Sequence, residues 1–441
     1  MLALLSPNQQ LLPLTAKTTA DGHLAIGGCD VVELAHTYGT PLYIVDELTV
    51  RTACQQYRQG FRQCYQGDSL ILYASKAWNC LALCALVHSE GLGMDVVSQG
   101  ELYTAVQAGV KGDRLYLHGN NKSLAEIEYA LSVGATIVVD NWQELKILAH
   151  QAQPVRMLLR ITPGIECHTH EYIRTGHLDS KFGFDPNDME QVFAFISNSP
   201  QLNCVGLHAH IGSQIFELQP HCDTAQVMAQ WFSLARAKYQ LELSELDIGG
   251  GLGIRYVETD DPPSIQQWVE AVCQSVTHAF DSQGLPLPKL LCEPGRSIIA
   301  NACVTAYTVG STKTVPEIRT YVAVDGGMSD NPRPITYQSQ YRAVIADRLH
   351  APLAQAVTIA GKHCESGDIL IKDIALPECL VGDTLVVLAT GAYNYSMASN
   401  YNRMPRPSAV LVGNGRSELI LRRETCADLI RQDCLPDRLR L

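Results

Sequence analysis

The chain has 441 residues, with 33 Lys and Arg against 45 Asp and Glu, which gives a formal net charge of −12. Hydrophobic residues make up 46% and charged residues 18%, a mixture too apolar for a disordered chain. The acidic balance argues against binding to nucleic acid, which needs clustered basic side chains. At roughly 150 residues per domain, the length predicts two or three domains.

The apolar runs and the cysteine spacing indicate in which cellular compartment the protein is located. No apolar run approaches the ~20 residues that span a bilayer, and the first 16 residues lack the basic start of a secretory signal. The 15 cysteines are scattered, with no CxxC pair, which fits neither a disulfide framework nor a zinc site. We therefore expect a cytoplasmic protein without a membrane segment.

Between residues 70 and 293, eight short apolar runs alternate with segments of helical period. Runs that are apolar throughout are typical of strands buried on both faces of a parallel sheet. Eight such strands with mostly helical connections predict a (β/α)8 barrel of the TIM type, although an open doubly wound sheet has the same alternation. The runs are Ile71–Ala74, Met94–Val97, Leu115–Leu117, Thr136–Val139, Met157–Ile161, Cys204–His208, Leu246–Ile248 and Lys289–Cys292.

After Arg296 the sequence becomes β-rich, with Gly and Pro between short runs, which predicts a separate antiparallel β domain. Within it, Gly413-Asn414-Gly415 is typical of a hairpin turn. We predict a barrel over 47–297, a C-terminal β domain over 298–441, and an N-terminal segment over 1–46 that joins the β domain. The β-rich runs are Val304–Val309, Thr320–Val324, Asp368–Ile374, Asp383–Leu388, Ala409–Val412 and Glu418–Arg422.

Polar or glycine residues stand in or just after nearly every predicted barrel strand. A barrel places its active site at the carboxyl ends of its strands, so this pattern favours a barrel with a site at that end. Polar groups at one or two strand ends would mean little, because strand ends meet water. The set is Lys76, Asp95, His118, Asp140, Arg160, His210, the glycines after Ile248, and Glu293.

Two of these positions suggest a particular chemistry. Lys76 directly follows an apolar run, where partial desolvation frees the amine as a nucleophile toward a carbonyl; a lysine that only reaches out to solvent would look the same. The Gly249–Gly253 segment lacks the spacing of a dinucleotide fingerprint and has no Walker lysine. Its four glycines suit backbone N–H groups that bind one phosphate, whereas a tight turn needs only one or two.

Glu293 stands three residues before Arg296 and offers two interpretations. The two side chains form an ordinary ion pair, or the carboxylate faces a protonated pyridine nitrogen and makes that ring an electron sink. His208 and His210 are two residues apart, so on a strand both point to the same face, one available for the core and the other for the site. Ser213 is a candidate phosphate donor.

Six separate motifs resemble those of the pyridoxal-phosphate-dependent decarboxylases with the alanine racemase-like fold. The resemblance runs in order along nearly the whole chain. It implies a carboxy-lyase that uses pyridoxal 5'-phosphate and no metal. The motifs are Tyr73–Ala77, His210–Gln214, Asp247–Gly253, Glu293–Arg296, Cys364–Asp368 and Gly391–Tyr393.

The resemblance implies a role for each matching residue. Lys76 would hold the cofactor, Glu293 would pair with its pyridine nitrogen, and His210 would stack on its ring. Cys364 would be the proton donor. The cofactor phosphate would be held by Ser213, Gly250, Gly251, Gly295, Arg296 and Tyr393. The substrate would be bound by Arg296, Arg333, Tyr337, Glu365 and Tyr393.

Three further motifs resemble members of the family that act on meso-2,6-diaminopimelate: His168–Tyr172, Ser180–Gly183 and Asn331–Pro334. An arginine and a tyrosine in the distal pocket imply a carboxylate at the far end of the substrate. The implied reaction is decarboxylation of meso-2,6-diaminopimelate to L-lysine and CO2, the last step of lysine biosynthesis. In such enzymes Cys364 and Glu365 would reach the neighbouring barrel, which implies a homodimer.

Other hypotheses keep the same fold. A decarboxylase of ornithine or arginine would need only an acid in the distal pocket. A racemase usually has an arginine in place of Glu293. A catalytically inactive binding protein would have no need of Lys76, Glu293 and Cys364 together, so their presence argues against it.

Overall fold

The computed structural model describes residues 6–165 and 180–440. The chain divides into two compact units. One holds residues 50–300 and the segment that ends at Gln10, and the other holds 11–49 and the chain from Asn301 onward. The N-terminal 50 residues are therefore shared between the units.

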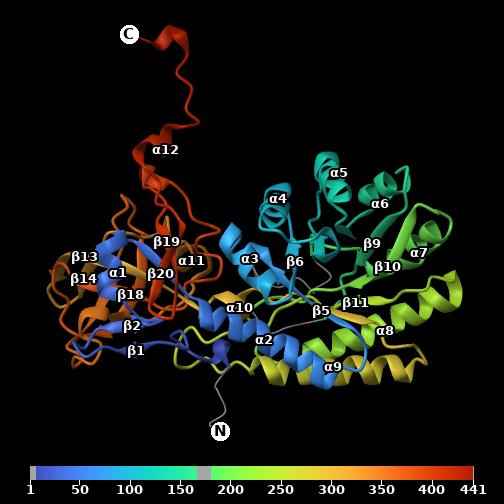
Figure 1. Cartoon of the computed structure of the whole chain (residues 1–441), viewed down its shortest axis with the longest axis horizontal. Helices are drawn as coiled ribbons and strands as arrows, with labels where there is room; N and C mark the ends of the chain where they lie inside the picture. Colours follow the sequence, from blue (N-terminus) through green and yellow to red (C-terminus); the bar gives the residue numbers. More distant parts are fainter. Residues whose placement is uncertain (1–5, 166–179, 441) are drawn as a thin grey trace. The chain divides into compact units, whose positions relative to one another are not determined.

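The first unit is a closed barrel of eight parallel strands (Figure 1). Successive strands are neighbours, and the pairing of Leu291 with Leu70 closes the ring between the last strand and the first. Each predicted run forms a strand, so the predicted barrel is confirmed. The strands are β5 (Ser69–Ala74), β6 (Gly93–Val96), β7 (Leu115–Leu117), β8 (Thr136–Val139), β9 (Val155–Arg160), β10 (Leu202–His208), β11 (Glu245–Asp247) and β12 (Lys289–Cys292).

Helices surround the barrel (Figure 1). Polar caps define where several of them begin. Ser123 and Ser264 each form a capping box, which satisfies backbone N–H groups that have no partner inside the helix. No helix in the described ranges is both long and apolar enough to cross a membrane. The helices are α2 (Glu47–Cys64), α3 (Leu81–Ser89), α4 (Gln99–Gln107), α5 (Leu124–Val133), α6 (Trp142–Ala149), α7 (Met189–Ser197), α8 (Gln219–Tyr239), α9 (Ile265–Ser282) and α10 (Arg296–Ile299).

A cluster of large apolar side chains from six of the strands fills part of the barrel. The barrel strands are covered on both faces, by side chains inside the barrel and by helices outside it. Their sequences are therefore continuously apolar rather than alternating. The cluster consists of Leu70, Leu72, Tyr116, Val138, Leu158, Val205 and Leu291. The strand ends are left to polar groups, as the sequence predicted.

The second unit is built on a nine-stranded sheet that is mostly antiparallel, which confirms the predicted class of the β domain. Two pairs, β4 with β19 and β14 with β16, are parallel. A parallel pair needs a long connection, and the barrel itself lies in the chain between β4 and β19. The strands are β4 (Leu42–Asp46), β13 (Cys303–Val315), β14 (Arg319–Val324), β15 (Ala343–Ile345), β16 (Gln355–Ala360), β17 (Ile369–Leu376), β18 (Thr384–Val387), β19 (Ser408–Gly413) and β20 (Arg416–Leu421).

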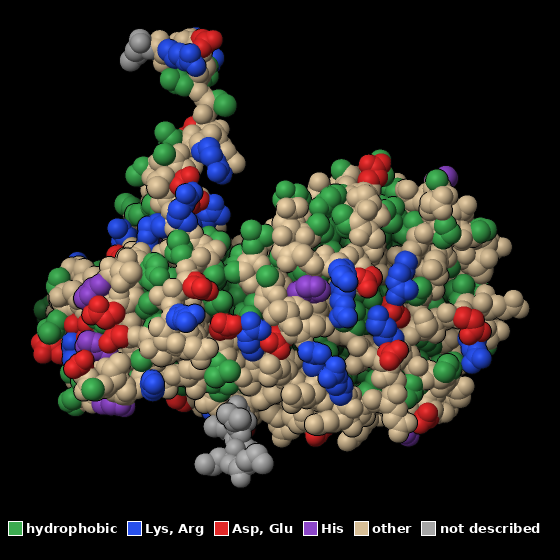
Figure 2. All heavy atoms as spheres, viewed as in Figure 1, with side chains coloured by type: hydrophobic (Ala, Val, Ile, Leu, Met, Phe, Trp, Pro, Cys, Tyr) green, Lys and Arg blue, Asp and Glu red, His purple; other side chains and the backbone are tan. Residues whose placement is uncertain are grey.

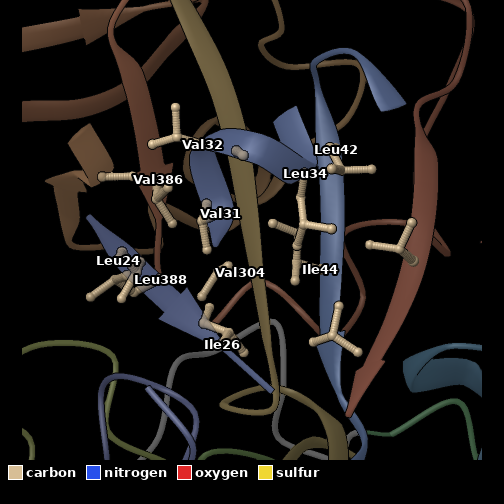
Figure 3. Close-up of a cluster of buried hydrophobic side chains, with 14 residues drawn as sticks. Leu24, Ile26, Val31, Val32, Leu34, Leu42, Ile44, Val304, Val386 and Leu388 are labelled. Carbon is tan, nitrogen blue, oxygen red and sulfur yellow. The ribbon is translucent and has the colours of Figure 1, made fainter. Parts of the chain in front are cut away.

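Elements of the N-terminal segment complete this unit. A small sheet of β1 (Lys17–Thr18), β2 (Leu24–Ile26) and β3 (Cys29–Asp30) leads into α1 (Val31–Tyr38), whose start is capped by Asp30. Figure 3 shows side chains of β2 and α1 packing with those of the central strands. The labelled side chains are Leu24, Ile26, Val31, Val32, Leu34, Leu42, Ile44, Val304, Val386 and Leu388.

Beyond β20 the chain continues through α12 (Cys426–Ile430) to the C-terminal end. Apolar side chains stay exposed here: Ile430 by 61%, Leu435 by 58% and Leu439 by 56%. Basic and acidic side chains lie between them (Figure 2). Arg406 ties the start of this segment to the sheet, because its Nε donates to Oε1 of Glu424 at 2.9 Å.

Candidate active site

Glu293 lies directly after β12, buried among groups from three other strands. Nε2 of His118, the residue after β7, lies 2.8 Å from Oε1 of Glu293. Nε2 of His208, the last residue of β10, hydrogen-bonds to Oε2 at 3.1 Å. Asp247 ends β11, and one polar atom from each of the four residues lies within 4.8 Å of the others. The closed barrel thus gathers two carboxyl groups and two imidazoles at its carboxyl end.

This cluster shifts the pKa values of its two carboxyl groups in opposite directions. Burial acts to raise the pKa of Glu293, but His118 and His208 outweigh it and hold that pKa well below its ordinary value. Burial, together with the charge of Glu293, raises the pKa of Asp247 well above its ordinary value. Burial lowers the pKa of His208 to about 4, so this ring is neutral near pH 7. Such pairs of carboxyl groups with separated pKa values are typical of active sites.

Lys76 lies in the short turn η2 (Ser75–Ala77), which follows β5 at the same end of the barrel. The turn is held by Glu101 of α4, whose Oε2 accepts from the Ser75 hydroxyl and from the backbone N–H of Val97, each at 2.8 Å. Burial lowers the pKa of His210 well below its ordinary value, and the charges of Lys76 and Arg160 lower it further. The amine of Lys76 therefore shares the electrostatic environment of His210.

His210 lies against the glycine loop that follows β11. Its Nδ1 accepts a hydrogen bond from the backbone N–H of Gly250 at 3.2 Å, which leaves the ring proton on Nε2. Gly249 has φ +67°, and a Cβ there would lie 2.7 Å from Nδ1 of His210. Only glycine fits that position, so the loop and the imidazole require each other.

The loops after β10 and β11 are joined by backbone hydrogen bonds. The N–H of Ile215 donates to the carbonyl of Gly251 at 2.9 Å, and the N–H of Gly253 donates back to the carbonyl of Ile215 at 3.0 Å. This pairing brings Ser213 to the same side of the barrel as the glycines. Backbone N–H groups and a hydroxyl in such an arrangement suit a phosphate.

Arg296 completes this group of anion-binding residues. It begins α10, is 5% exposed, and its Nη2 donates to the hydroxyl of Ser213 at 2.9 Å. Its Nη1 donates to the hydroxyl of Tyr256 at 2.7 Å. Gly295, the residue before it, packs closely: a Cβ there would lie 3.0 Å from Cβ of Ala74. The arginine, the serine and the glycine loop therefore form one basic, hydrogen-bonding corner.

In the β unit, Arg333 begins α11 (Arg333–Tyr337) and is 7% exposed. Its guanidinium carbon lies 5.5 Å from the ring centre of Tyr337 and 5.3 Å from that of Tyr393. Its Nη2 donates to the hydroxyl of Ser339 at 3.2 Å. Three of the residues predicted for substrate binding thus lie together, and the planar guanidinium is held against aromatic rings.

Cys364 and Glu365 lie in an exposed loop between β16 and β17. The loop is held by Asp368, whose Oδ2 accepts from the backbone N–H of His363 at 2.9 Å and contacts Nδ1 of its ring at 2.8 Å. Gly367 approaches α11, because a Cβ added there would lie 3.1 Å from a side chain of that helix. The predicted motif His168–Tyr172 lies outside the described residues.

The residues of the barrel fit a pyridoxal phosphate. A buried, ionised carboxylate suits a protonated ring nitrogen, and a neutral imidazole suits the ring face. The backbone at Gly250 is a close-fitting cradle, since a Cβ there would lie 2.3 Å from the carbonyl oxygen of Glu293. Two imidazoles and two carboxyl groups also match donor sets that bind transition metals. The lysine and the phosphate-binding corner beside them favour the organic cofactor.

Sequence reasoning did not commit to His118, His208 and Asp247 as site residues. The signal was present in part, because His118 follows a predicted strand and His208 ends one. The sequence did not show that His118 and His208 both contact Glu293, because β7, β10 and β12 are not neighbours in the chain. Tyr256, which orients Arg296, comes from a loop and carried no signal in the sequence.

Comparison with known proteins assigns the class. Residues 48–300 match the family model described as the pyridoxal binding domain of pyridoxal-dependent decarboxylases. This range covers the barrel and more than half of the chain. The chain therefore belongs to the family of pyridoxal-dependent decarboxylases.

Relatives along the full length narrow the family further. The chain is 59% identical to a diaminopimelate decarboxylase from Synechocystis, over 98% of this chain and 95% of the relative. It is 45% identical to the diaminopimelate decarboxylase of Bacillus subtilis, over 95% and 97% of the two chains. The solved structure of diaminopimelate decarboxylase from M. jannaschii in complex with L-lysine is similar with a TM-score of 0.90 and 32% identity, covering 96% of this chain and 99% of that one.

Proposed function

We propose that this chain is a carboxy-lyase that converts meso-2,6-diaminopimelate to L-lysine and CO2, with pyridoxal 5'-phosphate as its cofactor. The observation that carries this function is the 59% identity, over 98% of the chain, to a relative named diaminopimelate decarboxylase. The match spans both the barrel and the β unit, and therefore both sets of candidate site residues.

The barrel residues serve the cofactor in this proposal. When bound, pyridoxal phosphate supplies the electron sink for the pair of electrons that remains when CO2 leaves. Lys76 attaches the cofactor, and the charged Glu293 holds the ring nitrogen protonated. The neutral ring of His210 would stack on the ring face. The phosphate group is bound by Ser213, Gly250, Gly251, Gly295, Arg296 and Tyr393.

The β unit supplies most of the contacts to the substrate, and Arg296 of the barrel unit supplies another. The carboxylate oxygens of the substrate are bound by Arg333, Tyr337, Arg296 and Tyr393. The distal ammonium group of the substrate is bound by Glu365. Sγ of Cys364 gives its proton to the carbon atom that has lost CO2. An arginine already held against two aromatic rings supports this assignment, because little rotamer freedom remains to be lost on binding.

We also propose a homodimer, in which Cys364 and Glu365 serve the partner's barrel, and a cytoplasmic location. The homodimer comes from the family resemblance, and the location comes from the apolar runs and the cysteine pattern. The exposed position of the loop that carries these two residues supports the first, and the scattered cysteines support the second.

Release of CO2 from meso-2,6-diaminopimelate, ornithine and arginine, measured side by side with the cofactor-saturated protein, tests the function. We expect release from meso-2,6-diaminopimelate together with an equal amount of L-lysine, and release from the other two at least about 100-fold slower, as expected when a buried arginine loses its partner. Faster turnover of ornithine or arginine would contradict the proposal and favour a decarboxylase of another basic amino acid.

A further inference from the structure

We propose that His118 and His208 are positioning residues for Glu293: together they keep its carboxylate ionised and aim it at the cofactor's ring nitrogen. This inference rests on the proposed function for the identity of the cofactor. It gives a role to two residues, from different strands, to which the family resemblance assigned none.

The two histidines together contact both carboxylate oxygens of Glu293. Each contacts a different oxygen of Glu293 through Nε2, His118 at 2.8 Å and His208 at 3.1 Å. Their rings meet edge to face, with centres 4.9 Å apart. Their side chains are 5% and 1% exposed, so neither ring has room to turn toward solvent. A carboxylate held at both oxygens keeps one orientation.

This support is needed because the surroundings of Glu293 otherwise disfavour its charge. Burial favours a neutral carboxyl group. Oδ1 of Asp95 lies 3.7 Å from Nε2 of His118, so that imidazole stands between two acidic groups. The hydrogen bond of His208 and the close imidazole nitrogen of His118 favour the charged form of the carboxylate. A neutral Glu293 could not hold a ring nitrogen protonated.

Other charged and titratable groups lie near the Glu293 carboxylate on the remaining strands. They contribute to any pH dependence of its charge. The pKa of Asp247 is raised there, and Arg160 supplies a positive charge. These groups, taken over the packed elements among the described residues, are Lys76, Asp95, His118, Arg160, His208, His210, Asp247 and Cys292.

The test is a double-mutant cycle on cofactor binding, which needs no substrate. Apo-protein variants are titrated with pyridoxal phosphate, and affinity is read from the visible absorbance of the bound cofactor between pH 6 and pH 9. His118→Leu and His208→Leu are each made alone and in a Glu293→Gln background. Tyr116→Phe is the matched control, because it removes a buried hydrogen bond to another barrel carboxylate, that of Glu245.

In the wild-type background we expect each histidine variant to weaken binding by about 10- to 100-fold, the usual effect of losing a hydrogen bond to a buried charge. The pH at which the cofactor absorbance changes should move as well. In the Glu293→Gln background the same substitutions should change affinity by no more than about twofold, because their target is gone. His208→Gln, which keeps an N–H donor, should retain most of the affinity, and Tyr116→Phe should retain all of it.

An equal loss in both backgrounds would overturn the proposal, since it would show that the histidines act by packing alone. Where a leucine variant does not fold, histidine 15N NMR of the wild-type apo-protein decides instead. Nε2 of each ring should carry a proton, and an unprotonated Nε2 on either would contradict the proposal. None of these readouts depends on which amino acid is decarboxylated, so failure of the proposed function is seen separately in the CO2 assay.

Discussion

The guanidinium of Arg296 donates to the hydroxyl of Ser213 at 2.9 Å and so connects the helix after β12 with the loop after β10. The contact lies at a basic corner that we assign to the cofactor phosphate. Removal of the charge by Arg296→Gln should weaken binding of pyridoxal phosphate by about 10- to 100-fold. Binding of pyridoxal, which has no phosphate, should change little.

The measurement is a pair of titrations of the apo-protein, one with each compound. Tyr256→Phe serves as the control, because it removes a neighbour of the guanidinium without removing charge. An equal loss for both compounds in Arg296→Gln would assign the arginine to the structure of the barrel instead.

Substrate preference should depend on Arg333. The reacting ends of amino acids are alike, so discrimination must come from the far end, where only meso-2,6-diaminopimelate carries a second carboxylate. Arg333→Ala should lower kcat/KM for meso-2,6-diaminopimelate by about 10²- to 10³-fold and narrow its margin over ornithine. Arg333→Lys should not restore the margin, because an ammonium cannot offer a planar fork. An unchanged margin in both variants would remove Arg333 from the binding of the distal carboxylate.

Subunit sharing of the site predicts complementation between two inactive variants. In the proposed mechanism, Lys76→Ala removes the attachment point of the cofactor, and Cys364→Ala removes the proton donor. If Cys364 serves the partner's barrel, mixed dimers contain one site with both native residues and should regain up to about a quarter of wild-type activity when subunits exchange at random. Subunit exchange is followed with differently tagged chains. Proven exchange without any activity would place both residues in the site of a single chain.

The C-terminal segment should loosen in mild acid. Although burial opposes it, the hydrogen bonds from Arg406 and Asn400 lower the pKa of Glu424 to about 2. A lowered pKa stabilises the folded form above the pKa of the unfolded chain, and that contribution is lost as the pH falls toward 2. Limited proteolysis should therefore cut the segment after Glu424 faster at pH 3 than at pH 6. Glu424→Gln should be cut rapidly at both pH values, whereas the exposed Glu418→Gln should behave like wild type.

The strands of the barrel could be predicted from the sequence because each is a short apolar run between helical segments. β4 was not predicted as a strand: Leu42–Asp46 runs directly into α2, and its sheet partners β13 and β19 lie far away in the chain.

The candidate site, like the fold, could be predicted only where the sequence carries a local signal. Lys76, Glu293 and the glycine loop could be singled out because each carries a local signal at a strand end. The contacts of His118 and His208 with Glu293 could not, since they depend on how eight strands close into a ring. Likewise, Arg333 and Tyr393 are 60 positions apart in the chain, and only the fold of the β unit brings them together.

The central claim, that this barrel binds pyridoxal phosphate through Lys76 for decarboxylation, is tested most directly by borohydride reduction of the cofactor-loaded protein followed by peptide mapping. Reduction fixes a cofactor that is joined to a lysine as a stable secondary amine. We predict one labelled peptide per chain, with the label on Lys76, and no label in the Lys76→Ala variant. A label on any other lysine of the chain, or none in the wild-type protein, would contradict the account.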